Sequence, residues 1–282
     1  MPLTAKELIK QLLPAGIRDY SIRRNEYLRM GLPAPKASRL AWSVQRYEDV
    51  CDARLHLLPK AITQALGTCV DAGAHRGMWS LALLGMFQPK QLIAVECEPR
   101  LVQLLEITLA SRPGVRVVNA ALGAQEGTAT FYQLRHPAGS SLLQPRTEAI
   151  KEFEEHSWDV IGNAQVRTVT YDTLVKDEEV VSILKLDIQG AEKQVLTASS
   201  TGLRKTQAII IEVTFMPHYE QDATFEELHL LMQANGFGLY RLSSVYHRGG
   251  RALFADAVYV REELLQHATD TPASSMSKSL SC

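Results

Sequence analysis

A glycine-rich turn between a predicted strand and a predicted helix is the stretch of the chain most suggestive of chemistry. It comprises the residues Val70-Asp71-Ala72-Gly73-Ala74-His75-Arg76-Gly77. Glycines let the backbone turn sharply and approach a ligand without a Cβ in the way. In an open α/β sheet, ligands bind at the carboxyl ends of the strands, which is where this turn falls. The stretch therefore predicts a ligand-binding loop, although a tight turn without a ligand is consistent with the same residues.

An acidic side chain at the end of the next predicted strand indicates the kind of ligand. Glu96 lies 19 residues after Gly77. A carboxylate at that position can accept hydrogen bonds from both hydroxyls of an adenosine ribose. The sequence therefore favours a nucleoside cofactor, either a nicotinamide dinucleotide or S-adenosylmethionine.

The carboxylate of Asp71 helps to distinguish these two cofactors. A dinucleotide would bring an anionic pyrophosphate to the turn, where a neighbouring carboxylate repels it. S-adenosylmethionine carries a sulfonium and an ammonium instead, which Asp71 favours directly or by orienting backbone amides. The glycines are also spaced G-x-x-x-G rather than G-x-G-x-x-G. We infer that S-adenosylmethionine is the cofactor, and an NAD-dependent oxidoreductase is the weaker alternative.

Three side chains at or after the ends of predicted strands are candidates for a catalytic base: Asp187, Glu212 and His218. A methyl acceptor that must lose a proton needs such a base, which contributes roughly 10²–10⁴-fold to the rate. Asp187 is the best placed, but it can equally bind the ammonium of the cofactor. Glu212 lies in an apolar strand, where a buried ion pair with Lys185 is the competing explanation. His218 titrates in a suitable range, and its competing interpretation is an exposed loop histidine.

The sequence predicts no metal site. Magnesium would need two or three converging oxygen ligands, and Asp187 is followed by Ile188 and Gln189. The four cysteines form no C-x-x-C pair and no metal-ligand spacing with histidines.

Apolar runs that alternate with helical segments position these residues. Strands separated by single helices form βαβ units and therefore a mainly parallel sheet. Residues 128–134 alternate as a half-buried strand does, residues 135–165 are expected to form an ordered loop or insertion, and the last two strands a hairpin. The expected strands lie at residues 69–71, 92–96, 115–118, 181–187, 208–213, 239–242 and 252–260, and the expected helices begin near Gly77, Pro99, Ala191 and Thr224.

Composition places the chain among ordinary globular proteins. Its 282 residues are 46% hydrophobic and 22% charged, and the net charge is −1. These values exclude a disordered chain and give no reason to bind nucleic acid. No stretch approaches the ~20 apolar residues that a membrane span needs, and no secretory leader is recognisable. A cytoplasmic location with reduced cysteines is the expectation.

The chain is expected to hold one large α/β domain with additions at both ends. Residues 1–60 are predicted to form a helical N-terminal cap with eleven Lys or Arg and six Asp or Glu. The domain itself spans residues 61–265, and residues 266–282 form a mobile tail. The helices of the cap are candidate contacts of a homodimer.

Four motifs occur in a fixed order along the chain: Asp71-Ala-Gly73-Ala-His-Arg-Gly77, Glu96-Cys-Glu98-Pro99, Asn119-Ala-Ala-Leu-Gly123 and Lys185-Leu-Asp187-Ile-Gln-Gly190-Ala-Glu192. Together they resemble the FkbM family of S-adenosylmethionine-dependent methyltransferases, over about residues 67–261. The resemblance implies a Rossmann-like class I methyltransferase fold, with a mainly parallel seven-stranded sheet whose last strand is antiparallel. It also implies O-methylation of a sugar, glycan or secondary metabolite. A non-catalytic protein that keeps the cofactor site is the alternative.

The resemblance further implies a role for each motif residue. Glu96 would hold the ribose, Cys97 would pack near the adenine, and Asp187 would face the methyl group or the ammonium. Asn119 and Ala120 would stand at the adenine edge. The methionine end would be lined by Asp71, Gly73, Ala74, His75 and Gly77. Apart from the resemblance, the aromatic side chains of Phe215 and Tyr219 are candidates to stack on the acceptor, a small molecule or a glycan, and ordinary packing is the competing interpretation.

Overall fold

The computed structural model describes residues 55, 57–109, 112–146, 158–243 and 245–269. Most of the predicted N-terminal cap and of the predicted tail lies outside these residues. Within the described part of the chain, no helix is long and apolar enough to cross a membrane.

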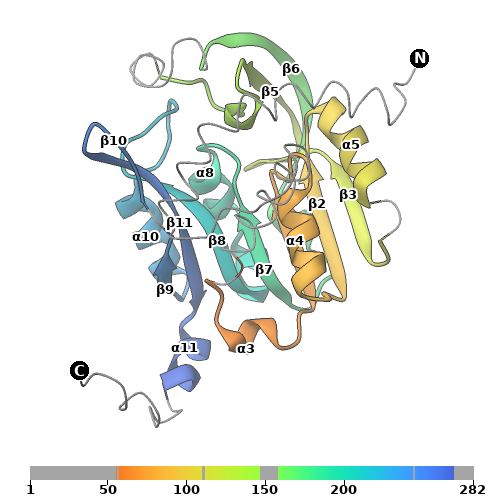
Figure 1. Ribbon diagram of the computed structural model, residues 1–282, viewed down its shortest axis with the longest axis vertical. Helices are drawn as coiled ribbons and strands as arrows, with labels where there is room; N and C mark the ends of the chain where they lie inside the picture. The colour runs from red at the N-terminus through yellow and green to blue at the C-terminus, as the bar shows by residue number, and fades with distance from the viewer. Residues whose placement is uncertain (1–54, 56, 110–111, 147–157, 244, 270–282) are drawn as a thin grey trace, which may run out of the picture.

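A central sheet of eight strands forms the body of the molecule (Figure 1). Its order is β10-β11-β8-β7-β1-β2-β3, and β9 pairs with β11. The five strands from β8 to β3 are parallel, and β11 is antiparallel to its neighbours. The bounds are β1 Thr68–Ala72, β2 Gln91–Glu96, β3 Val115–Asn119, β7 Val181–Leu186, β8 Thr206–Thr214, β9 Phe237–Leu242, β10 Tyr246–Arg248 and β11 Arg251–Arg261.

This topology confirms the predicted α/β fold with a mostly parallel sheet and an antiparallel last strand. The predicted number of seven strands was wrong by one, because the short β10 joins the edge of the sheet. Gly249 and Gly250, both with positive φ, form the turn between β10 and β11. The predicted hairpin of the last two strands is therefore an antiparallel pair of β9 and β11 with β10 inserted between them in sequence.

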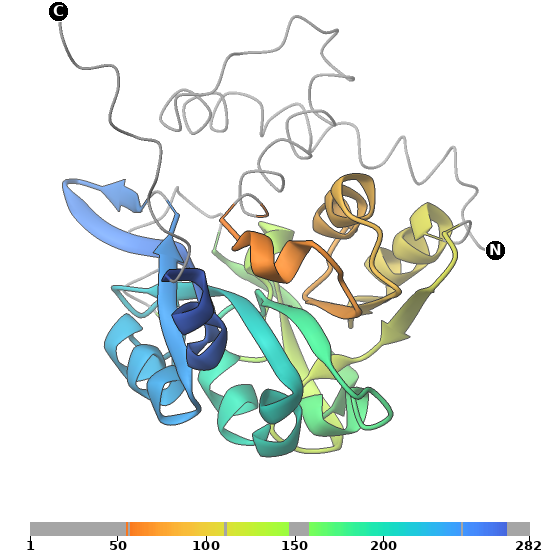
Figure 2. The same cartoon turned by 90° about the horizontal axis from the view of Figure 1, so that it is seen from below.

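Helices cover both faces of the sheet (Figure 2). On one face, side chains of α3, α4 and α11 pack against β1, β8 and β11, and α5 packs against β2 and β3. On the other face, α7 to α10 surround the largest apolar cluster. The bounds are α3 Lys60–Thr63, α4 Met78–Met86, α5 Pro99–Leu109, α7 Tyr171–Leu174, α8 Glu192–Thr197, α9 Ser200–Lys205, α10 Phe225–Ala234 and α11 Glu262–Thr269.

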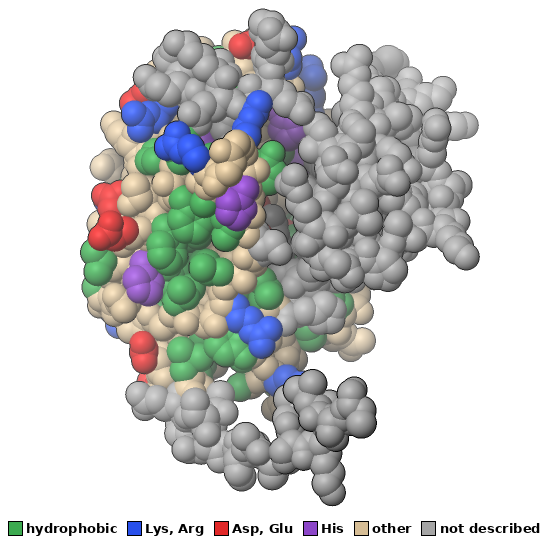
Figure 3. Space-filling view, turned by 60° about the vertical axis from the view of Figure 1, so that its left-hand side comes forward, with side chains coloured by type: hydrophobic (Ala, Val, Ile, Leu, Met, Phe, Trp, Pro, Cys, Tyr) green, Lys and Arg blue, Asp and Glu red, His purple; other side chains and the backbone are tan. Residues whose placement is uncertain are grey.

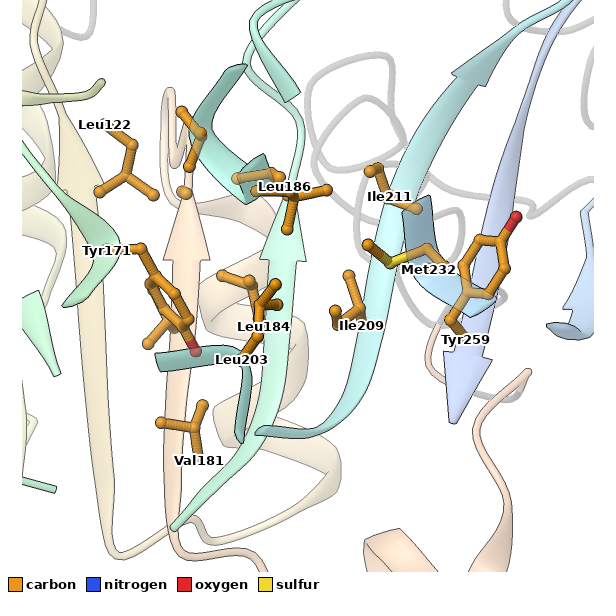
Figure 4. Packing of buried hydrophobic residues seen from close by; sticks show 14 of the residues in the cluster. Leu122, Tyr171, Val181, Leu184, Leu186, Leu203, Ile209, Ile211, Met232 and Tyr259 are labelled. Carbon is orange, nitrogen blue, oxygen red and sulfur yellow. The ribbon is translucent and has the colours of Figure 1, made fainter. Parts of the chain in front are cut away.

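The largest apolar cluster fixes β7 and β8 at the centre of the fold. Leu184, Leu186, Ile209 and Ile211 are each at most 1% exposed, and Figure 4 shows the first two on β7 beside the last two on β8. Branched side chains that are buried on both faces are typical of central parallel strands. Because β7 and β8 are locked in this way, the residues that leave their carboxyl ends start from fixed positions.

A second, three-stranded sheet lies at the carboxyl ends of β2 and β3. It has the order β4-β6-β5, with β4 Ala121–Leu122, β5 Gly127–Leu134 and β6 Val160–Val169, and a 3-10 turn η1 follows at Pro137–Gly139. The strand predicted at residues 128–134 is confirmed. The prediction of a loop or insertion up to residue 165 missed β6, whose Gly162 and Asn163 weaken any strand pattern in the sequence.

Candidate functional site

The glycine-rich turn connects β1 to α4 and packs against two other strand ends. Gly73, His75 and Gly77 all have positive φ, at 71°, 50° and 76°. The N–H groups of Gly73 and Ala74 donate to the carbonyl of Val95 on β2. A Cβ on Gly73 would lie 1.9 Å from the carbonyl oxygen of Asp187, so only glycine fits there. The left-handed His75 is unusual for a side-chain-bearing residue, and such backbone is found mainly at functional sites.

Glu96 joins this turn to the end of β2. Its carboxylate is 7% exposed and accepts hydrogen bonds from the backbone N–H of His75 at 2.8 Å, of Cys97 at 2.8 Å and of Glu98 at 2.9 Å. Burial raises the pKa of Glu96, and these three hydrogen bonds lower it. Among the described residues, Oε2 accepts a hydrogen bond from His75 alone, so it has a lone pair left for a further donor.

Asp71 does not point into a ligand site, because its side chain is fully buried. Oδ2 accepts a hydrogen bond from the Ser80 hydroxyl at 2.7 Å, and Oδ1 lies 3.2 Å from the Lys185 ammonium. Of the two roles expected for this carboxylate, direct contact or orientation of the turn, the geometry leaves orientation. Its charge is also balanced by Lys185, so it repels a phosphate less than the sequence argument assumed.

Lys185 joins Asp71 to Asp187. Its ammonium lies 3.4 Å from Oδ2 of Asp187 and donates to the carbonyl of Gly73 at 3.3 Å. The side chain of Asp187 is 22% exposed, whereas those of Lys185 and Asp71 are 6% and 0% exposed. Asp187 is therefore the member of this ion-pair network that a ligand can contact. Sequence reasoning considered Lys185 only as a partner of Glu212; the signal was the pairing of β1 with β7, which sets Lys185 beside Asp71.

Hydrogen bonds within the loop after β7 and from two other segments hold this loop in place. The Gln189 amide donates to Oδ1 of Asp187 at 2.8 Å, and the Tyr219 hydroxyl donates to Oε1 of Gln189 at 3.0 Å. The Ser141 hydroxyl donates to the Gln189 carbonyl at 2.6 Å. These contacts come from three separate segments, so the Asp187 carboxylate has a defined orientation. Sequence reasoning assigned no role to Gln189, although it lies in the fourth motif, or to the side chain of Ser141.

The two aromatic side chains expected to meet the acceptor do other work. Tyr219 is 3% exposed and its hydroxyl donates to Gln189, which favours ordinary packing over stacking on an acceptor. Phe215 packs against Phe225, with 5.5 Å between the ring centroids, and against the largest apolar cluster. Phe225 in turn stacks on His229 of α10. Figure 3 shows hydrophobic side chains gathered at the surface on one face of the molecule.

Glu212 lies near the carboxyl end of β8, and His218 lies in the loop after this strand; Asp187 follows the neighbouring strand β7. Leu186 of β7 pairs with Ile211 of β8, so Asp187 and Glu212 each stand one residue beyond that pair. His218 is 4% exposed among the rings of Trp158 and Phe254, at 5.6 and 6.2 Å. Burial lowers the pKa of His218 to about 4, so its imidazole is neutral at neutral pH.

The residues expected near an adenine lie together at the ends of β2 and β3. Glu96 pairs with Asn119 in register, and Ala120 donates to the carbonyl of Glu96 at 3.0 Å. Cys97 is buried against Phe131 and Val166 of the second sheet. Burial raises the pKa of the Cys97 thiol, which keeps it a neutral, apolar side chain. No group of three or more metal-ligating side chains occurs among the described residues.

Glu192 is a buried carboxyl to which the sequence analysis assigned no role. It is 4% exposed at the start of α8 and accepts a hydrogen bond from the N–H of Ile188 at 2.9 Å. Burial raises the pKa of Glu192 from its ordinary value of 4.5 to about 8. At neutral pH this group is therefore protonated in the folded protein.

Glu192→Gln is expected to stabilise the protein at high pH. The folded state keeps a proton on Glu192 that the unfolded chain releases. Titration of Glu192 therefore does not reduce the free energy of unfolding below about pH 4.5 and reduces it progressively as the pH rises to about 8. Glutamine keeps the acceptor for Ile188 without a titrating group. Urea unfolding should show a gain of roughly 1–3 kcal/mol at pH 8 that shrinks towards pH 5. A variant that is less stable than the native protein at pH 8 would contradict this account.

Comparison with known proteins agrees with the site described above. The sequence profile of the methyltransferase FkbM domain matches residues 71–239, more than half of the chain. No curated protein matches the chain in sequence. Among solved structures, the chain is similar to magnesium protoporphyrin IX methyltransferase (ChlM) from Synechocystis PCC 6803 with bound SAM, with a TM-score of 0.44 and 12% identity over 80% of this chain and 86% of that chain.

Two further solved structures show the same level of similarity. A SAM-dependent methyltransferase from Leishmania major has a TM-score of 0.44 and 10% identity over 83% of this chain and 80% of that chain. TrmK from M. capricolum, in complex with S-adenosylhomocysteine, has a TM-score of 0.40 and 10% identity over 73% of this chain and 70% of that chain. The assignment rests on the family profile, which covers the turn, Glu96 and the Asp187 loop. The chain therefore belongs to the FkbM family of S-adenosylmethionine-dependent methyltransferases.

Proposed function

We propose that the protein transfers the methyl group of S-adenosylmethionine to a hydroxyl of a sugar, glycan or secondary metabolite, and that Asp187 is the catalytic base. The observation that carries this proposal is the Asp187 carboxylate, which is partly exposed and is held by Lys185 and Gln189 beside the glycine-rich turn. A positioned carboxylate at this place suits removal of the proton from an alcohol as the new bond forms.

The residues around the turn suit S-adenosylmethionine. The partly exposed carboxylate of Asp187 is complementary to the sulfonium, and Oε2 of Glu96 can accept from a ribose hydroxyl. Gly73, Ala74, His75 and Gly77 would hold the methionine end through backbone groups, with Asp71 fixing the turn from below. The adenine would lie against Cys97, Asn119 and Ala120.

When bound, S-adenosylmethionine supplies an activated methyl group, so the protein needs only to place the acceptor and to remove its proton. An acceptor oxygen about 3 Å from the methyl carbon, in line with the bond that breaks, provides much of the rate. Asp187 would orient the acceptor hydroxyl and take its proton. Glu212, one strand away, and the neutral imidazole of His218 are the other candidate bases in the same region. The net charge of −1 favours a small or glycan acceptor over nucleic acid.

The proposal is tested by methyl transfer from S-adenosylmethionine with an isotope-labelled methyl group to a panel of glycosides and alcohols. The labelled methyl should appear on oxygen. Asp187→Asn should lower turnover by roughly 10²–10⁴-fold, since it removes the base. The same variant should bind S-adenosylhomocysteine within about threefold of the native protein, because this product lacks the sulfonium charge.

Other outcomes would overturn parts of the proposal. If binding of S-adenosylhomocysteine collapses in Asp187→Asn, the carboxylate is a cofactor ligand and the base lies elsewhere. Matched variants Glu212→Gln and His218→Asn then locate the base. Label found on nitrogen or carbon would contradict O-methylation. Absence of transfer to every acceptor, with tight binding of the cofactor, would favour a non-catalytic protein.

A further inference from the structure

The buried Lys185 of β7 links the glycine-rich turn after β1 to the loop after β7 that carries Asp187. Lys185 approaches Asp71 at 3.2 Å, Asp187 at 3.4 Å and the Gly73 carbonyl at 3.3 Å. The ammonium donates a hydrogen bond to the Gly73 carbonyl and forms ion pairs with the two carboxylates. Two of the acceptors belong to β1 and its turn, and the third belongs to the loop after β7. One side chain therefore ties the cofactor loop to the proposed base.

The strand register explains why the lysine can do this. Asp71 and Lys185 are direct neighbours on the parallel pair of β1 and β7, and both lie on the face covered by α4. Asp187 is two residues beyond Lys185 and so emerges on the same face, because side chains alternate along a strand. The N–H of Asp187 also donates to the carbonyl of Ala72 at 3.2 Å, which keeps the two chains paired up to this point.

A catalytic role for the lysine itself does not fit its surroundings. Its side chain is 6% exposed and lies behind Asp187. The ammonium carries no lone pair and stands between two carboxylates, which stabilise the charged form. Lys185 therefore acts on the reaction only through the groups that it holds.

We propose that Lys185 is a positioning residue that fixes the Asp187 carboxylate opposite the donor methyl group by tying it to the Gly73 turn. This inference rests on the proposed function, in which Asp187 faces the sulfonium. Its consequence is a coupling: Asp187 distinguishes the charged S-adenosylmethionine from the neutral product only while Lys185 holds it. The ratio of the two ligands' dissociation constants measures this coupling without an acceptor.

The test compares the effect of Asp187→Asn in two backgrounds. Lys185→Met alone would leave Asp71 buried without its counter-charge and can prevent folding. The double variant Asp71→Asn with Lys185→Met removes one negative and one positive charge, so the ion-pair network keeps its net charge of −1. Asp187→Asn then removes the same charge in both backgrounds, and any difference reports position rather than charge.

Calorimetry with S-adenosylmethionine and S-adenosylhomocysteine should give the following result. In the native background, Asp187→Asn lowers the preference for S-adenosylmethionine by about tenfold, as expected for loss of a contact with a charged group. In the double-variant background the same change has an effect of about twofold or less. Lys205→Met is the matched control, since Lys205 donates to the Val175 and Lys176 carbonyls away from the site. That variant should leave the preference unchanged.

A purely structural lysine predicts a different pattern. The double variant would then lose thermal stability or affinity for both ligands alike, and Asp187→Asn would still lower the preference about tenfold. That result would overturn the inference and leave the proposed function intact. If the native protein shows no preference that depends on Asp187, the placement of Asp187 at the sulfonium fails, and with it the proposed function.

Discussion

Replacing Gly73 with alanine is expected to abolish binding of the cofactor and to destabilise the fold by about 3 kcal/mol or more. The new Cβ would lie 1.9 Å from the carbonyl oxygen of Asp187, and a backbone atom cannot move aside cheaply. The φ of 71° adds a strain of about 1–2 kcal/mol for any residue with a Cβ, and overpacking adds about 1–3 kcal/mol. Relief of the clash would push the turn away from the Asp187 loop. Urea unfolding and calorimetry with S-adenosylhomocysteine measure the two effects.

Gly250→Ala separates the clash from the strain. Gly250 has a φ of 82° in the β10–β11 turn, and a Cβ there would meet nothing within 4 Å. Its replacement should cost about 1–2 kcal/mol and leave cofactor binding unchanged. Equal destabilisation by the two variants, or normal affinity in Gly73→Ala, would contradict the close packing of the turn against the Asp187 loop.

Glu96→Gln is expected to weaken binding of S-adenosylhomocysteine by about 100-fold. The two carboxylate oxygens of Glu96 accept three backbone N–H groups and have capacity for a ribose hydroxyl. An amide has a single oxygen acceptor, so its NH₂ group would face a backbone N–H or the hydroxyl, whichever way it turns. Loss of a hydrogen bond to a charged group costs about 1.5–3 kcal/mol, and the affinity should fall accordingly.

The control for this prediction is the neighbouring carboxylate. The Glu98 carboxylate accepts the N–H of Leu101 at 3.0 Å and lies just before α5, so Glu98→Gln should leave the affinity within about threefold. A 2′-deoxy analogue of S-adenosylhomocysteine sharpens the test. It should bind the native protein more weakly than the parent ligand and bind Glu96→Gln about equally well. If the variant still distinguishes the two ligands, Glu96 does not hold the ribose.

The sequence predicted the parallel half of the fold well because each strand there carries its own signal. Strands β1, β2, β7 and β8 are short apolar runs buried on both faces, and each ends in a glycine, an acid or a turn. The capping box of Thr224 and Glu227 at the start of α10 is equally local, and the structure contains both of its hydrogen bonds. Such features need only neighbouring residues, so they can be recognised without knowledge of the fold.

The features that escaped prediction depend on contacts between distant residues. Residues of β6 pair with residues of β5 that lie 26 to 41 positions earlier in the chain, and the exposed Val160 and Ile161 do not follow a buried pattern. The partners of Lys185 became visible only through the register of β1 against β7. The loop after β8 buries Tyr219 against Gly139 and Gln189. Because this burial depends on distant residues, the sequence left both stacking on an acceptor and ordinary packing open for its ring.

The candidate site shows the same division. The turn, Glu96 and Asp187 were found because their residue types recur at the ends of strands, where ligands of α/β proteins bind. Their supporting side chains, Ser80, Ser141 and Gln189, were assigned no role, because their partners are set by contacts that the sequence does not show. The sequence predicted S-adenosylmethionine from the negative charge of Asp71 without its counter-charge, and the structure shows that Lys185 balances this charge.

Calorimetric titration of the full chain with S-adenosylhomocysteine, with NAD as a parallel control, tests the central claim most directly. The site described here predicts micromolar binding of S-adenosylhomocysteine and no binding of NAD, because the glycines of the turn are spaced G-x-x-x-G rather than G-x-G-x-x-G. Binding of NAD with no binding of S-adenosylhomocysteine would contradict the assignment of the cofactor and, with it, methyl transfer at Asp187.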